Sequence, residues 1–136
     1  MLNVCTWNIR GVMSSTMCLT EFLRETYCDI VILNEHKLHP NHEKYLHSID
    51  YRYSCIAKCE SVSSSNPMQF STGKSGVAIL FKKSLEYSVK EIPVHSTRVI
   101  GLELYGTNTV PIYIFGYLPA DSDIESYRDV IRGTVL

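Results

Sequence analysis

Residues 29–35, DIVILNE, contain the run that decides the fold. Four apolar residues in succession, Ile30 to Leu33, are typical of a strand that is buried on both faces, as the strands of parallel sheets are. Such a strand needs a covering layer on each side. The residues before it predict one of these layers.

The residues from 2 to 35 predict a strand, a helix and a second strand. Residues 2–8, LNVCTWN, mix β-branched, aromatic and polar residues and lead into a Gly-containing turn, which is typical of a strand. Between Ser14 and Cys28 the apolar residues recur at helical spacing, and Ser14 or Ser15 is expected to cap a helix of about three turns. The expected buried stripe of that helix is Leu19, Phe22, Leu23 and Tyr27.

The later residues predict hairpins. Residues 51–57, 76–81 and 85–92 have β patterns, and the turn KKS is expected to join the last two as a hairpin. Residues 99–105 and 111–117 predict a second hairpin around the turn GTNT. The polar stretch 59–76 predicts an exposed loop, and a capping box at Ser122 and Glu125 predicts a helix from Asp123 to Ile131. The fold class is therefore α/β with a mixed sheet.

Composition and charge limit the kind of protein. A chain of 136 residues, 45% hydrophobic and 20% charged, fits one globular domain. Its 13 basic and 14 acidic residues leave a net charge of -1, so nucleic acid would have to be bound through a local site. No apolar run approaches the roughly 20 residues that cross a bilayer, and no leader pattern is present, so we expect an intracellular protein of cytoplasm or nucleus.

Five scattered cysteines favour reduced thiols over a disulfide framework. We expect them to be small buried hydrophobic residues. Cys55 and Cys59 are four apart, which is not the spacing of a zinc knuckle, so they are expected to be structural.

Topology alone indicates where a site would lie. A right-handed crossover makes the two strands of residues 2–35 parallel, so both end at the same edge of the sheet. Asn8 and Glu35 stand at those two ends. Open α/β sheets bind ligands outside the carboxyl ends of their strands, so an amide and a carboxylate at this edge outline a candidate site.

Five segments in this order resemble the endonuclease/exonuclease/phosphatase superfamily. They are WNIRG at 7–11, ILNEH at 32–36, GVAIL at 76–80, a strand entered through Arg98, and GYLP at 116–119. The likeness is above all to the branch fused to retrotransposon (LINE-type) reverse transcriptases, which is similar to the apurinic-site nucleases of DNA repair. It implies a DNase I-like α/β sandwich with a mixed sheet, of which residues 1–136 are expected to be the N-terminal part, truncated at its C-terminus.

The resemblance implies roles for four residues. Asn8 would hydrogen-bond within the site and Glu35 would bind a divalent cation, Mg²⁺ or Mn²⁺, with Asn8 as a second ligand. Tyr117 would place its hydroxyl near the scissile phosphate of DNA. Arg10 stands where some repair nucleases have an acidic residue, which favours the retrotransposon branch, and it is expected to contact a phosphate. Magnesium suits such a site because it prefers oxygen ligands and retains several waters.

Two motifs of the family, Asp-x-Asn and Ser-Asp-His, are not among these 136 residues. We therefore expect no hydrolysis by this chain alone. One alternative is a non-catalytic remnant of a mobile element, and another is a phosphatase or phosphodiesterase of the same superfamily. A missing half would also leave an apolar sheet face open to self-association, and the residues expected on it are Val77, Ile79, Ile112 and Ile114.

Each candidate also has a structural interpretation. Glu35 is alternatively a solvated strand end, Asn8 a residue that shapes the turn, and Tyr117 a core aromatic. The histidines at 36, 39 and 42 recur every third residue, but Pro40 interrupts any helix that would align them on zinc. We interpret them as residues of a solvated loop.

Overall fold

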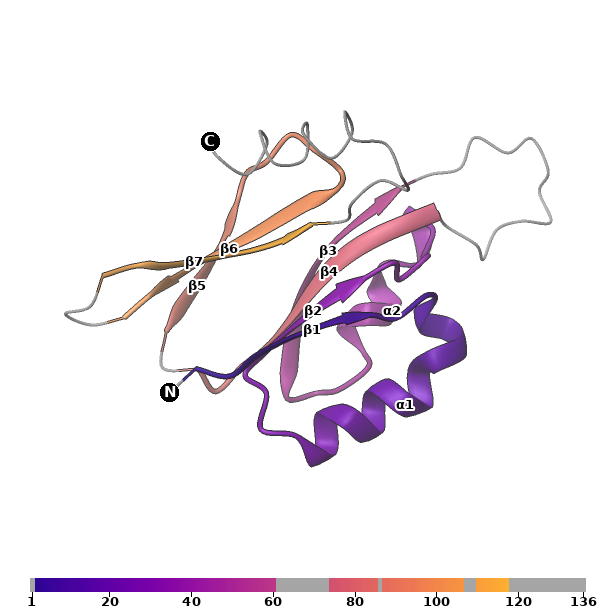
Figure 1. Cartoon of the computed structure of the whole chain (residues 1–136), viewed down its shortest axis with the longest axis horizontal. Coiled ribbons are helices and arrows are strands. Elements are labelled where there is room, and N and C mark those ends of the chain that lie inside the picture. Colours follow the sequence, from indigo (N-terminus) through magenta and orange to yellow (C-terminus); the bar gives the residue numbers. More distant parts are fainter. Residues whose placement is uncertain (1, 61–73, 86, 107–109, 118–136) are drawn as a thin grey trace.

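A computed structural model of the chain describes residues 2–60, 74–85, 87–106 and 110–117. Three layers follow one another: a helical layer, a four-stranded sheet and a three-stranded sheet. Figure 1 shows helix α1 (Val12–Glu25) against one face of the larger sheet, and the smaller sheet on the other side. The expected loop 59–76 is wrong at both ends, because residues 59–60 and 74–76 belong to strands. Its residues 61–73 and the expected helix from Asp123 lie outside the described residues.

The larger sheet is mixed, as predicted. Its strands lie in the order β1-β2-β4-β3, with β1 parallel to β2 and the other pairs antiparallel. The run of Ile30 to Leu33 is buried in one of the two central strands, which confirms the prediction from that run. The strands are β1 (Val4–Asn8), β2 (Ile30–Asn34), β3 (Tyr53–Glu60) and β4 (Lys74–Lys82).

Helix α1 buries Leu19 and Leu23, as its pattern predicts, but both predicted ends are wrong. It begins at Val12, after Gly11, and no side chain caps it, so the predicted cap at Ser14 or Ser15 is absent. It ends at Glu25, which leaves Tyr27 outside the helix with 84% of its side chain exposed.

The covering layer continues after Glu35 with two short helices. These are η1 (Pro40–His42) and α2 (Lys44–His47), neither of which the sequence pattern predicted. The hydroxyl groups of Tyr45 in α2 and Thr16 in α1 are hydrogen-bonded to each other. Leu38 and Leu46 pack with α1 and one face of the larger sheet to form the first core.

The smaller sheet has the order β5-β6-β7, and both of its pairings are antiparallel. The predicted hairpin of residues 99–117 is confirmed as β6 (Val99–Tyr105) and β7 (Ile112–Tyr117). The predicted hairpin of 76–92 is wrong, because β4 pairs with β2 and β3, whereas β5 (Ser88–Ile92) pairs with β6. The chain thus crosses from one sheet to the other after β4.

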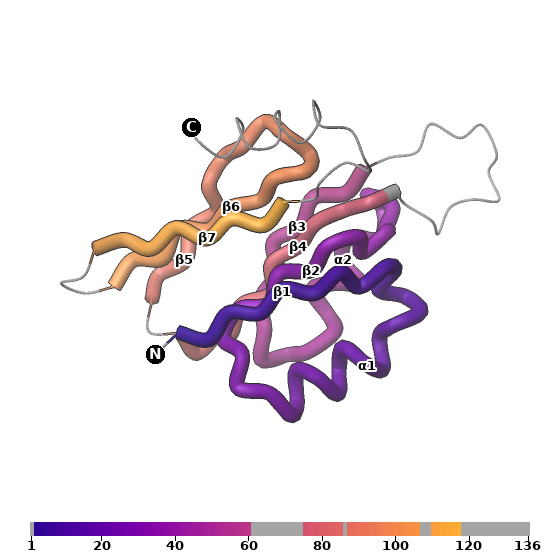
Figure 2. The backbone as a smooth tube through the Cα atoms, viewed as in Figure 1, coloured from indigo at the N-terminus to yellow at the C-terminus, as the bar shows by residue number. Residues whose placement is uncertain are grey.

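A second core fills the space between the sheets. It consists of Ile30, Ile32, Val77, Ile79, Ile100, Leu102 and Leu104. Val77 and Ile79 are fully buried there, so the expectation that they lie on an open face is wrong. Ile114 is partly buried against this core, and Ile112 is 37% exposed. The tube in Figure 2 shows the smaller sheet crossing the larger one on the side opposite α1.

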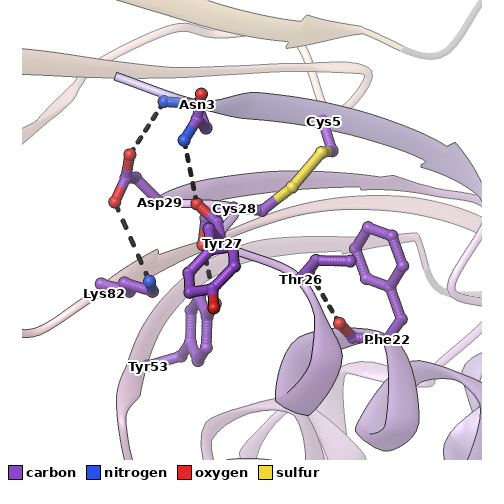
Figure 3. The surroundings of a disulfide bond; sticks show 9 residues. All are labelled: Asn3, Cys5, Phe22, Thr26, Tyr27, Cys28, Asp29, Tyr53 and Lys82. Carbon is purple, nitrogen blue, oxygen red and sulfur yellow. Dashed lines mark hydrogen bonds and ion pairs between the residues drawn. A yellow bond between two sulfur atoms is a disulfide. The ribbon is translucent and has the colours of Figure 1, made fainter. Parts of the chain in front are cut away.

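The expectation for the cysteines is wrong at three positions. Cys5 and Cys28 form a disulfide that joins β1 to the residues before β2 (Figure 3). Cys18 is exposed, whereas Cys55 is buried as expected and Cys59 is partly buried. In the described part of the chain, no helix is both long and apolar enough to span a membrane.

Candidate functional site

Strands β1 and β2 end side by side at one edge of the larger sheet. Asn8 lies opposite Asn34 at the end of their parallel pairing. Hydrogen bonds between the two segments continue past the ends of the strands. The amide of Ile9 donates to the carbonyl oxygen of Asn34 over 3.0 Å, and the amide of Gly11 donates to the carbonyl oxygen of Glu35 over 2.7 Å. The backbone segments that carry Asn8 and Glu35 are therefore fixed to each other.

The segment of Glu35 is also held from its other side, by the start of β4. The amide of His36 donates to the carbonyl oxygen of Gly76 over 3.3 Å, and the amide of Lys37 donates to the carbonyl oxygen of Ser75 over 2.7 Å. Glu35 thus stands in a short loop between two partners. This arrangement limits how far its backbone can move.

The same edge concentrates unusual backbone conformations. In the described part of the chain, four residues other than glycine have positive φ: Arg10 (50°), Glu35 (58°), Lys37 (57°) and Ser75 (58°). A left-handed conformation costs such a residue roughly 1–2 kcal/mol. Residues held in such conformations cluster at ligand and catalytic sites, where the surrounding structure fixes them.

Asn8 and Asn34 lie on the same face of the sheet, because they are register partners in parallel strands. The preceding residue, Trp7, points to the α1 side, where its ring lies 5.5 Å from that of Phe22. Asn34 follows Ile32, which is part of the core between the sheets. Both amides therefore belong to the side of the larger sheet that faces the smaller sheet.

The side chain of Asn34, which the sequence analysis did not single out, has an unsatisfied atom. Its Oδ1 is buried and finds no hydrogen-bond partner within the described residues. An unpaired buried acceptor costs about 1–3 kcal/mol. A cation would satisfy this oxygen, and Glu35, the next residue in the sequence, carries a carboxylate, which is a ligand that magnesium prefers.

In the described part of the chain, carboxylates, imidazoles and thiols alone form no metal site. Among the residues that the structure describes, no three His, Cys, Asp or Glu side chains are grouped so that they would hold a metal ion. A cation at this edge would therefore depend on Glu35, amide oxygens and groups of the bound substrate. Magnesium sites of this kind retain several waters.

His36 is fully buried, so its assignment to a solvated loop is wrong. Its Nδ1 accepts from the amide of Leu38 over 3.0 Å, which leaves Nε2 to donate to the carbonyl oxygen of Lys58 at 2.9 Å. Burial lowers the pKa of this imidazole. The ring fits only because Gly76 has no side chain, since a Cβ there would lie 2.3 Å from its Cε1 atom.

The three spaced histidines have different surroundings. Both ring nitrogens of His36 are hydrogen-bonded to the backbone. His39 is partly buried and accepts from the amide of Asn41 over 3.2 Å, whereas His42 is exposed. His36 is therefore a structural residue beneath the Glu35 loop.

Strand β7 approaches the same edge from the smaller sheet. Figure 1 shows the arrowheads of β1, β2 and β7 directed to one side of the molecule. A Cβ at Gly116 would lie 2.6 Å from Cγ2 of Ile32, so β7 runs close against β2. Tyr117 ends the strand and is 41% exposed. Its side chain leaves β7 on the face opposite Gly116, and its role at the site stays a prediction.

Comparison with known proteins adds a family. The sequence model of the Endonuclease/Exonuclease/phosphatase family matches residues 5–132 of this chain. No curated protein matches the chain.

Two solved structures are similar to this one. The crystal structure of the AP endonuclease LMAP from Leishmania major has a TM-score of 0.67 and 19% identity, over 93% of this chain and 43% of that one. An AP endonuclease from Archaeoglobus fulgidus has a TM-score of 0.58 and 21% identity, over 97% of this chain and 48% of its own. At these identities the likeness shows the fold alone, and it confirms the DNase I-like α/β class. The chain spans less than half the length of either structure.

Proposed function

Because the chain belongs to the endonuclease/exonuclease/phosphatase family, we propose that the edge of Asn8, Asn34 and Glu35 is the metal-binding part of a site for metal-dependent hydrolysis of phosphodiester bonds in DNA. The carrying observation is Glu35 itself. It has a left-handed backbone, its loop is hydrogen-bonded on both sides, and the residue before it, Asn34, has an unsatisfied buried amide oxygen.

The residues of this edge fit a divalent cation. The carboxylate of Glu35 would be the charged ligand, and the side-chain oxygens of Asn34 and Asn8 would be neutral ones, a set that suits Mg²⁺ or Mn²⁺. A bound cation would offset the negative charge that builds up on the phosphoryl oxygens. The fixed backbone of the Glu35 loop favours this function, because it limits how far the residue that carries the carboxylate can move before any ligand arrives.

Residues around the edge would position the substrate. Arg10 is exposed in the turn that follows Asn8, where its guanidinium would contact a DNA phosphate. Tyr117 would bring its hydroxyl to the scissile phosphate around the end of β7. The AP endonucleases of similar fold make DNA the favoured substrate. Arg10 also favours the retrotransposon branch of the family over the repair nucleases that have an acidic residue at this position.

A metal titration with matched variants tests this proposal. Binding of Mn²⁺, followed by electron paramagnetic resonance, should weaken at least about tenfold in Glu35→Gln, since even outer-shell partners of metal ligands contribute that much. Glu91→Gln in β5, an exposed carboxylate of the smaller sheet, is the control and should bind like the parent. Equal affinities of Glu35→Gln and the parent would refute the proposal and favour a non-catalytic remnant.

Asn34→Leu separates a metal ligand from a structural residue. Leucine removes the unsatisfied oxygen, so the free energy of unfolding in urea should stay the same or rise. Mn²⁺ affinity should fall in the same variant. A loss of stability with unchanged Mn²⁺ affinity would instead show that Asn34 only supports the fold.

A further inference from the structure

A surface pocket of about 540 Å³ opens in the helical layer, next to the loops that follow β1 and β2. Its volume lies within the range of roughly 300–1,000 Å³ that is usual for ligand sites. The residues that matter for its chemistry are Met13, Leu38, Asn41, His42, Lys44 and Tyr45. They come from the start of α1, the loop after Glu35, η1 and α2.

The pocket is close to the candidate site along two segments of the chain. Leu38 is three residues after Glu35, and Met13 is three residues after Arg10. Three residues span at most about 10 Å, so the pocket begins within that distance of both. Figure 1 shows α2 near the start of α1, and the hydrogen bond between Thr16 and Tyr45 joins these helices.

The pocket combines an apolar floor with a polar rim. Leu38 is buried and the Tyr45 ring is partly buried, while Met13 is 57% exposed. An aromatic ring and a polarisable thioether form a surface on which a nucleobase can stack. On the rim, the exposed side chains of Asn41 and Lys44 offer an amide and a cation.

Charge around the pocket favours an anionic ligand. Residues 37–47 contain two lysines and three histidines but one acid, Glu43, which lies 3.8 Å from Nε2 of His47. The whole chain has a net charge of -1, so this segment is locally more basic than the rest. The exposed Lys37 lies beside the turn at Gly11, where a Cβ would be 4.0 Å from its Cδ.

We propose that this pocket binds one nucleotide of the DNA strand, next to the phosphate at the Glu35 site. The base would stack on Met13 and Tyr45, and its phosphate would pair with Lys44. The proposal rests on the proposed function, because it takes the strand at the Glu35 site as its neighbour. It differs from that function in needing no metal and no cleavage.

Methionine methyl resonances give a direct test on the whole chain, in EDTA, with thymidine 3′,5′-bisphosphate as the probe. Met17 is the internal control, because it lies one turn further along α1, is 86% exposed and does not line the pocket. The nucleotide should shift the Met13 methyl resonance and leave that of Met17 in place. Inorganic phosphate, which has no base, should shift Met13 much less.

Lysine variants test the phosphate contact. Lys44→Gln should weaken binding of the bisphosphate about fivefold, through loss of one charge-assisted hydrogen bond. Lys83→Gln, an exposed lysine in the turn after β4, should leave the affinity unchanged. Glu35→Gln should also bind the nucleotide normally, which separates this proposal from the metal site.

Three results would overturn the proposal. They are equal shifts, or no shift, of Met13 and Met17; an equal response to phosphate alone; and an affinity that Lys44→Gln does not change. A metal site lost in Glu35→Gln with the Met13 shift retained would support both proposals. A Met13 shift without any Mn²⁺ binding would refute the proposed function alone.

Discussion

At the candidate site, single residues are held in place by contacts with residues that are far away in the sequence. The positions of Asn8 and Glu35 at one edge follow from the βαβ pattern, because parallel strands end together. Asn34 was missed, since a polar residue at a strand end looks ordinary and only packing reveals its unsatisfied oxygen. His36 looked solvated beside Lys37 and Pro40. Its burial depends on Gly76, which no local pattern connects with it.

His36 should make stability depend on pH. Its pKa in the folded chain lies below the ordinary 6.5, so the unfolded chain binds more protons between these two values. The free energy of unfolding should therefore rise with pH in this window and gain nothing more from His36 above pH 6.5. Urea unfolding at pH 5.5 and 7.5, in parent and His36→Gln, measures this contribution. An identical pH dependence in both proteins would contradict it.

At the scale of elements, apolar runs and the alternation of apolar and polar residues predicted most strands, but they did not predict which strands pair with each other. β4 is buried on both faces and pairs with two strands of the larger sheet, whereas the short turn after it suggested a hairpin. The start of α1 was also missed, because the amides of Gly11 and Val12 donate to carbonyl groups of the Glu35 loop instead of to a serine. Spacing could not reveal the disulfide, which depends on the packing of two distant segments.

The disulfide should stabilise the chain and leave one reactive thiol. It closes a loop between residues 23 apart, and reducing it should lower the free energy of unfolding by about 3 kcal/mol. Burial raises the pKa of Cys55 to about 12 and of Cys59 to about 11, so at pH 8 only exposed Cys18 should react quickly with a disulfide reagent.

The control for the disulfide is Cys5→Ser, whose stability should not respond to reductant. Its remaining thiol at Cys28 is buried and should react slowly. Five reactive thiols instead of three in the denatured, unreduced parent would contradict the disulfide.

At the scale of the whole molecule, the residue pattern predicted the α/β class and the resemblance implied a sandwich, but the partner sheet was not expected within these 136 residues. The second core forms because β6 and β7 cover Ile32, Val77 and Ile79, whereas Val77 and Ile79 were expected on a face left open by a missing half of the domain. The similar solved structures are more than twice as long as the part that this chain matches. Metal binding is therefore a separate question from cleavage.

Plasmid nicking addresses cleavage by these 136 residues. They contain no Asp-x-Asn or Ser-Asp-His triplet, so we expect no Mg²⁺-dependent nicking of supercoiled plasmid above that of a Glu35→Ala control. Nicking by the parent that the Glu35→Ala variant lacks would show that this edge suffices for hydrolysis. It would also overturn the expectation of incompleteness.

The central claim is that the ends of β1 and β2 form a preorganised divalent-cation site. Paramagnetic broadening of backbone amide resonances by substoichiometric Mn²⁺ tests it most directly, because the broadening maps the site without any substitution. We predict that the amides of Ile9, Gly11, His36 and Lys37 broaden first, while those of β5 and of the turn at Lys83 stay sharp. The claim would be contradicted if other amides broadened first, or if the amides near all exposed carboxylates broadened equally.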